Sequence, residues 1–228
     1  MIVIKLLKFL QLIKNSKFII GRPKKNNLII FDCETSVAIK ILLSDKDYYL
    51  LKIRPDKIDT IYLNLELIVI MIKNFFKHSL KINYLLGLIS QLDPKVILTQ
   101  YDNSLEFYQL NKIFKNTKIK FISFQGHIRT LKNMSHLKEN FYIDNYCGFS
   151  EYERQFLQQN GLKAKNFISA GSLVSAAALE YFKKNKIDLK IEYDVCLISE
   201  LISPIYNELD EKFLKMLENL SLLIKDLK

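Results

Sequence analysis

Short apolar runs that alternate with helical patterns constrain the fold of this chain most. Leu28–Phe31, Lys95–Thr99 and Phe121–Phe124 are too short for helices and are typical of buried strands. Helical patterns separate these runs, and strands that alternate with helices form a mainly parallel sheet covered on both faces. The sequence therefore predicts an α/β protein with a Rossmann-like, doubly wound, mainly parallel sheet.

Further predicted elements follow the same alternation. Strands are predicted at Tyr48–Ile53, Phe141–Asp144, Asn166–Ala170 and Tyr193–Ser199, and helices at Leu80–Leu92, 104–114, Ser150–Asn160, 172–183 and Ile205–Leu227. The apolar run Ile61–Phe76 predicts a buried helix capped by Asp59 and Thr60; a strand is the alternative, which the length of the run disfavours. Asp102 or Asn103 is the predicted cap of the helix that follows them.

The length and the order of the elements predict the domain organisation. A chain of 228 residues is long enough for one large domain, or for one domain and part of another. We expect a basic N-terminal segment over residues 1–27 and a Rossmann-like domain over 28–190. Residues 191–228 are predicted to begin a second α/β domain or to form a helix that crosses to it.

The N-terminal segment predicts a basic amphipathic helix over Met1–Lys14. Its apolar and polar faces are formed by Ile2, Leu6, Phe9, Leu10 and Ile13, and by Lys5, Lys8, Gln11 and Asn15. It is too short and too often interrupted by lysine to span a bilayer. Two alternatives remain open: the helix lies on an anionic membrane surface through residues 1–25, or it packs on its own domain.

The charge and the cysteines limit the partners and the compartment. The formal charge of +10 favours anionic partners, namely nucleic acid, nucleotide phosphates or an anionic membrane. Three isolated cysteines lack the spacing of metal ligands, so no metal site is predicted and a reducing compartment such as the cytoplasm is expected. No recognition helix or basic patch interleaved with aromatic residues supports nucleic acid as the partner.

Polar residues directly after the strand Phe121–Phe124 form the first candidate site. Gln125, Gly126, His127 and Arg129 follow within five residues. Gly126 permits a positive φ or a close approach to a ligand, His127 is titratable, and the guanidinium of Arg129 suits phosphate or carboxylate. Open α/β sheets bind ligands beyond the carboxyl ends of their strands. The alternative is a polar turn without a ligand.

Three other strand ends carry polar residues. Asp32 and Glu34 follow the first strand and suit a sugar hydroxyl or a general base, or else cap a helix. Asp102 and Asn103 follow the strand at 95–99 and suit an anion or a sugar hydroxyl. Gly171-Ser172 opens a helix and suits a phosphate or hydroxyl contact; core packing or capping is the alternative. The chain has no Walker motif, no Gly-x-Gly-x-x-Gly and no nucleophile elbow.

These motifs resemble a family of bacterial surface-carbohydrate biosynthesis proteins related to glycosyltransferases of the B-type (GT-B) fold. The resemblance spans roughly Lys17–Leu227. It rests on Asp32-x-Glu34, on the turn Thr99–Asn103, on Phe121–Arg129, on Ala170–Ser172 and on the strand Tyr193–Ser199. The likeness implies two Rossmann-like domains that face a cleft, of which this chain supplies the acceptor-side domain.

The resemblance also implies an activity and its residues. The chain is expected to serve polysaccharide or lipid-linked glycan synthesis at the cytoplasmic membrane face, with a sugar nucleotide as donor substrate and no cofactor. His127 or Asp32 is expected to act as base and Arg129 to neutralise the leaving phosphate. The remaining expected substrate contacts are Glu34, Asp102, Asn103, Gln125, Gly126, Gly171 and Ser172. The alternative is a non-catalytic, membrane-peripheral binding or scaffolding module.

Overall fold

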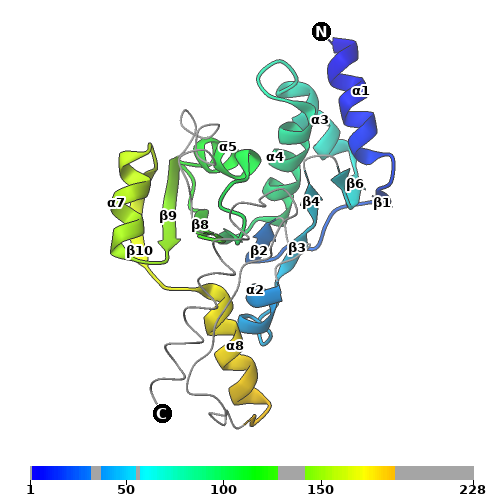
Figure 1. Ribbon diagram of the computed structural model, residues 1–228. Coiled ribbons are helices and arrows are strands. Elements are labelled where there is room, and N and C mark those ends of the chain that lie inside the picture. Colours follow the sequence, from blue (N-terminus) through cyan, green and yellow to red (C-terminus); the bar gives the residue numbers. More distant parts are fainter. Residues whose placement is uncertain (1, 32–36, 55–56, 128–141, 188–228) are drawn as a thin grey trace, which may run out of the picture. The chain divides into compact units, whose positions relative to one another are not determined.

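A parallel sheet of six strands, in the order β10-β9-β8-β7-β2-β3, forms the centre of the protein. The computed structural model describes residues 2–31, 37–54, 57–127 and 142–187 (Figure 1). The strands of this sheet are β2 (Leu28–Phe31), β3 (Tyr49–Leu51), β7 (Val96–Thr99), β8 (Lys120–Phe124), β9 (Tyr142–Gly148) and β10 (Lys163–Ser169). The helices are α1 (Ile2–Ile13), α2 (Val37–Leu42), α3 (Leu65–Lys73), α4 (Leu80–Leu92), α5 (Leu105–Ile113), α7 (Glu151–Gln159) and α8 (Leu173–Lys184).

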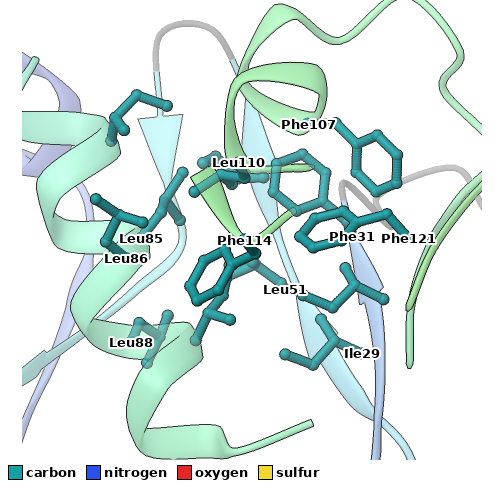
Figure 2. Packing of buried hydrophobic residues seen from close by; sticks show 14 of the residues in the cluster. Ile29, Phe31, Leu51, Leu85, Leu86, Leu88, Phe107, Leu110, Phe114 and Phe121 are labelled. Carbon is teal, nitrogen blue, oxygen red and sulfur yellow. The ribbon is translucent and has the colours of Figure 1, made fainter. Parts of the chain in front are cut away.

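The alternation of side chains along the strands places helices on both faces of this sheet. Ile29 of β2 is in register with Ile97 of β7, and Ile97 with Phe121 of β8. These side chains belong to the main core with α4 and α5, whose packing Figure 2 shows. Ile30 and Leu98 point to the other face, where they pack with Ile39 of α2. The predicted α/β class with a doubly wound, Rossmann-like parallel sheet is therefore confirmed.

Helix α4 is the most deeply buried helix among those described, and its predicted bounds Leu80–Leu92 are confirmed. Ser79 caps its first turn by accepting a hydrogen bond from the amide of Ile82, and Asp93 ends it in the left-handed conformation with φ of 53°. Nearly every residue of α4 is buried. Such a helix must be apolar on most sides, because the sheet and neighbouring helices pack around it.

The prediction of a single element over Ile61–Phe76 was wrong. The structure divides this run into strand β6 (Thr60–Leu63) and helix α3. Asn64 separates them, because its side chain accepts a hydrogen bond from the amide of Leu67 and so caps the helix. Asp59 and Thr60 are therefore not the caps. The polar residue inside the apolar run was the available signal for this boundary.

Two small sheets outside the main one were not predicted. β1 (Lys17–Ile20) pairs in parallel with β6, and the short strands β4 (Ile53–Arg54) and β5 (Lys57–Ile58) pair antiparallel. The predicted strand Tyr48–Ile53 accordingly breaks into β3 and β4. The alternating pattern in each of these short strands covers too few residues to distinguish a strand from a loop by periodicity.

Among the other described elements, one helix cap and the ends of two strands differ from the predictions. Ser150 caps α7 and Asn160 ends it, as expected. The cap of α5 is Ser104, whose Oγ accepts a hydrogen bond from the amide of Phe107, and neither Asp102 nor Asn103 has this role. The strand predicted at Phe141–Asp144 continues to Gly148, and the strand predicted at Asn166 begins at Lys163.

Helix α1 forms where the amphipathic pattern predicted it. Phe9 and Ile13 pack against the main core, with the ring of Phe9 6.4 Å from that of Tyr84. Leu6 and Leu10, which share the predicted apolar face, are about half exposed. The helix therefore packs on its own domain through part of its apolar surface and exposes the rest. Among the helices that the structure describes, none combines the length and apolarity needed to cross a bilayer.

The C-terminal predictions lie outside the described residues. Contacts divide the chain into the units Met1–Ile187 and Asp188–Lys228, and the second unit is not described. The strand Tyr193–Ser199, the helix Ile205–Leu227 and a second domain from residue 191 therefore stay predictions.

Tyr84 joins α4 to β6, and its ionisation lowers the free energy of unfolding at alkaline pH. Its hydroxyl accepts a hydrogen bond from the amide of Tyr62 and donates one to the carbonyl of Thr60. Burial raises the pKa of Tyr84 to about 12. Because the unfolded pKa is about 10, the folded state binds this proton more tightly. The resulting stabilisation is complete below pH ~10 and is lost as the pH rises toward 12.

We expect Tyr84→Phe to reduce the decrease in unfolding free energy that the wild-type protein shows at alkaline pH. In the wild-type protein this group removes roughly 2 to 3 kcal/mol of unfolding free energy between about pH 10 and 12, and the variant lacks that contribution. At neutral pH the variant should be less stable by about 1 kcal/mol, because the amide of Tyr62 loses its partner. Urea unfolding of both proteins from about pH 8 to 11.5 measures the difference. Parallel pH curves for the two proteins would contradict this assignment.

Candidate functional site

The strand order places a topological switch point between β2 and β7. From β2 the chain adds β3 on one side, and β7, β8, β9 and β10 then extend the sheet on the other. Loops that leave neighbouring strands in opposite directions open a crevice at the carboxyl edge of a parallel sheet, where α/β proteins bind ligands. The loop after β7 lies beside this point. Asp32 and Glu34 lie outside the described residues.

Asp102, in the loop after β7, is almost fully buried and holds three strand ends together. Its Oδ2 accepts a hydrogen bond of 2.8 Å from the hydroxyl of Tyr146 on β9. Its Oδ1 accepts one of 3.2 Å from the amide of Gly126, directly after β8. The hydroxyl of Tyr108 donates to the carbonyl of Asp102 at 2.7 Å. The buried carboxylate therefore fixes the position of the loops after β7 and β8.

Gly126 stands where the loops after β7 and β8 meet. A Cβ atom on this residue would lie 2.8 Å from the carbonyl oxygen of Gln100 and 3.5 Å from Oδ1 of Asp102. A side chain would force the two backbones apart, since carbon and oxygen do not approach so closely without strain. The glycine thus permits a close approach to the neighbouring loop, whereas the sequence predicted a positive φ or an approach to a ligand.

Gln125 braces the turn that carries His127. It is 2% exposed, and its Nε2 donates to the carbonyl of His127 and to the carboxylate of Glu153 on α7, both at 3.1 Å. Its Oε1 accepts a hydrogen bond of 3.0 Å from the amide of Phe149. Its amide therefore bonds within the protein at both ends. Glu153 was not predicted to belong to this edge, because its helix is distant in sequence.

Two predicted residues, His127 and Asn103, expose their side chains at this edge. His127 follows β8 and Asn103 follows β7, so the neighbouring ends of two paired strands carry them. In the loop after β7, Oε1 of the half-buried Gln100 is itself buried and has no hydrogen-bond partner within the described part of the chain. Ser123, fully buried at the end of β8, has the same property at its Oγ. The exposed imidazole and amide of His127 and Asn103 suit a ligand rich in hydroxyl groups.

Gly171 and Ser172 shape the start of α8. Gly171 has φ of +73°, a conformation that favours glycine, and the Oγ of Ser172 accepts a hydrogen bond of 3.2 Å from the amide of Ser175. Both residues are exposed. Of the two alternatives for this pair, capping is therefore present in the structure. Leu173, the next residue, packs against the small core formed by Ile30, Ile39 and Leu98.

The remaining observations concern residues that bear reactive groups. Arg129 lies outside the described residues, as do Asp32 and Glu34. Within the described ranges, no three His, Cys, Asp or Glu residues are grouped so that they could hold a metal ion. Burial raises the pKa of the Cys147 thiol, which disfavours the reactive thiolate.

The described part of the edge thus divides into two layers. Asp102, Gln125 and Tyr146 form a buried layer that fixes the loops, and His127 and Asn103 form an exposed layer that a ligand can reach. Such an arrangement can bind and orient hydroxyl or phosphate groups. No family model, curated protein or solved structure matches this chain.

Proposed function

We propose that the chain is the acceptor-side domain of a glycosyltransferase-like protein and binds a sugar-containing ligand at the carboxyl edge of its six-stranded sheet. One observation carries the ligand site: the strand order puts a switch point between β2 and β7, beside the exposed polar residues. The sugar chemistry rests on the resemblance of the strand-end motifs to surface-carbohydrate biosynthesis proteins. The donor would be a sugar nucleotide, and the acceptor a glycan or a lipid-linked glycan.

The proposal assigns different roles to the two layers of the edge. His127 and Asn103 would contact the ligand, with His127 accepting a proton from an acceptor hydroxyl or orienting it. Asp102 and Gln125 would act as positioning residues, because their polar atoms bond within the protein. Arg129 keeps the role expected from the resemblance, a donor toward phosphate.

A non-catalytic binding or scaffolding module at the membrane is the second candidate. It is favoured by the internal bonding of Asp102 and Gln125, which leaves His127 as the exposed titratable residue among the predicted site residues that the structure describes. Transfer usually needs a base together with a group that stabilises the leaving phosphate. Turnover of a sugar nucleotide by the full gene product, with membranes as acceptor source, separates the two candidates.

Binding of small sugar phosphates tests the ligand site. We expect N-acetylglucosamine 1-phosphate and glucose 1-phosphate to shift backbone amide resonances of residues 100–104 and 125–127 in a nuclear magnetic resonance titration. His127→Ala and Asn103→Ala should each weaken binding about tenfold, because a hydrogen bond to a charged or hydroxyl-rich ligand is lost. Gln109→Ala is the matched control, since this exposed side chain lies on α5 away from the strand ends.

Three results would contradict the ligand site. Shifts confined to other parts of the sheet would place binding elsewhere. Equal affinity of the wild type and both site variants would remove His127 and Asn103 from the contact. An equal response to inorganic phosphate alone would indicate an anion site without sugar recognition.

A further inference from the structure

Helix α3 presents apolar side chains to solvent along its outward face. Leu65, Ile68, Val69 and Ile72 are exposed at the spacing of one helix face, and Phe76 continues this line after the helix ends. The exposed fractions reach 78% for Leu65 and Phe76. Helices on the surface of a domain are ordinarily polar on the outward side. The apolar run Ile61–Phe76 was predicted to be buried, so its exposed outward face indicates a surface that another molecule covers.

Helix α1 also exposes apolar side chains, and it contacts the same helix, α4. The two helices contact α4 one turn apart: Phe9 of α1 packs on Tyr84, and Cγ of Leu67 in α3 lies 3.2 Å from the position of a Cβ at Gly87. Both α1 and α3 lie against α4 (Figure 1). In β1, Ile20 is 91% exposed and in register with Leu63, two residues before α3 begins.

We name this region the α1–α3 surface. Its principal exposed apolar residues are Leu6, Leu7, Leu10, Leu65, Ile72 and Phe76. Groups of large exposed apolar side chains on a domain mark sites of interaction.

Basic residues surround the α1–α3 surface. Every charged residue among the first 27 of the chain is basic. Lys14 and Lys17 are exposed beside α1, and Lys73 and Lys77 are exposed near the end of α3. The acidic residue of α3, Glu66, forms an ion pair of 2.7 Å with Arg22. An apolar centre with a positive rim matches an anionic lipid surface, whereas the like charges would oppose a second copy of the chain.

We propose that the α1–α3 surface docks onto an anionic lipid bilayer, with both helices lying in the interface. Helix α3 has 9 residues, which span roughly 14 Å against an apolar bilayer core of about 30 Å. It can therefore enter the headgroup boundary but cannot cross the core. The sequence alone pointed to residues 1–25 for such a contact, and the structure adds β6 and α3 to it. The inference does not rest on the proposed ligand site.

Co-sedimentation of the 228-residue chain with lipid vesicles tests this docking. We expect binding to phosphatidylcholine vesicles that contain roughly 30% phosphatidylglycerol, and little binding to phosphatidylcholine alone. Ile72→Ser/Phe76→Ser should lower the partition coefficient at least about tenfold, because two large apolar side chains no longer enter the interface. Lys14→Gln/Lys17→Gln should lower it by roughly tenfold or more at low salt.

Matched variants on other elements provide the controls. Val174→Ser/Leu179→Ser removes two exposed apolar side chains of α8, and Lys163→Gln/Lys165→Gln removes two exposed charges of β10. Both controls should bind vesicles as the wild type does. Circular dichroism checks that each variant folds. If Ile72→Ser/Phe76→Ser does not fold, Leu7→Ser/Leu10→Ser provides the same readout from α1.

Several outcomes would overturn the docking. The wild type would fail to bind anionic vesicles, or the control variants would lose as much binding as the α1–α3 variants. A wild-type dimer in size-exclusion chromatography that Ile72→Ser/Phe76→Ser dissociates, without vesicle binding, would assign the surface to a second copy of the chain. His127→Ala should leave vesicle binding unchanged, so a failed ligand site and a failed docking surface are distinguishable.

Discussion

Phe107→Ala is expected to lower the free energy of unfolding by about 3 to 5 kcal/mol, the range for removing a fully buried aromatic side chain. Phe107 lies on α5 with 0% exposure and makes edge-to-face contacts with Phe31 of β2 and Phe121 of β8, each with 5.4 Å between ring centroids (Figure 2). The ring thus joins one helix to two strands that are separate in sequence. Its loss leaves a cavity that the rigid sheet cannot close. Urea unfolding followed by circular dichroism measures the change.

The control for this substitution is Phe76→Ala. The same side chain is removed, but Phe76 is 78% exposed, so the free energy of unfolding should change by less than about 0.5 kcal/mol. A loss below about 1 kcal/mol for Phe107→Ala, or equal losses for the two variants, would show that α5 does not pack on the sheet as described.

Asp102→Ala is expected to destabilise the protein by about 2 to 4 kcal/mol, because a buried hydroxyl and a partly buried amide lose a carboxylate acceptor. These donors are the hydroxyl of Tyr146 and the amide of Gly126. The same substitution should also loosen the turn before His127, which Gly126 begins. Urea unfolding measures the first effect, and amide hydrogen exchange at 125–127 measures the second.

A double-mutant cycle isolates the contact on which this prediction depends. Tyr146→Phe removes the hydroxyl that donates to Asp102, so the two substitutions together should cost less than the sum of their separate effects. The exposed neighbour Asn103→Ala is the control and should change stability by less than about 0.5 kcal/mol. Additive effects of Asp102→Ala and Tyr146→Phe would mean that their 2.8 Å contact contributes nothing to stability.

Local sequence patterns predicted most elements of the sheet and of its helices. Apolar runs bounded by capping residues give strands such as β2 and helices such as α4 directly. The division of Ile61–Phe76 was missed, because apolarity alone does not separate a strand from a helix and one asparagine supplies the boundary. The order of the strands was also not predicted, since it depends on pairing between segments that are distant along the chain.

The exposed part of the candidate site was easier to predict than its buried support. His127 and Asn103 follow strands directly, so the parallel fold alone places them at one edge. The contact of Asp102 with Tyr146 joins residues 44 positions apart, and no local pattern marks it. Glu153 reaches Gln125 for the same reason, through the packing of α7 beside β9.

The pairing of β2 with β7 has a consequence for synthesis on the ribosome. Leu28 is in register with Val96, so the partner of β2 emerges 96 − 28 = 68 residues later. At ordinary rates of translation this interval lasts roughly 3 to 14 s. During this interval, the apolar strand β2 (Leu28–Phe31) has β3 as a partner on one edge, and its other edge stays unpaired. The free edge of β2 in nascent chains should therefore be open to chaperones until about residue 100 has left the exit tunnel, when β7 can pair with it.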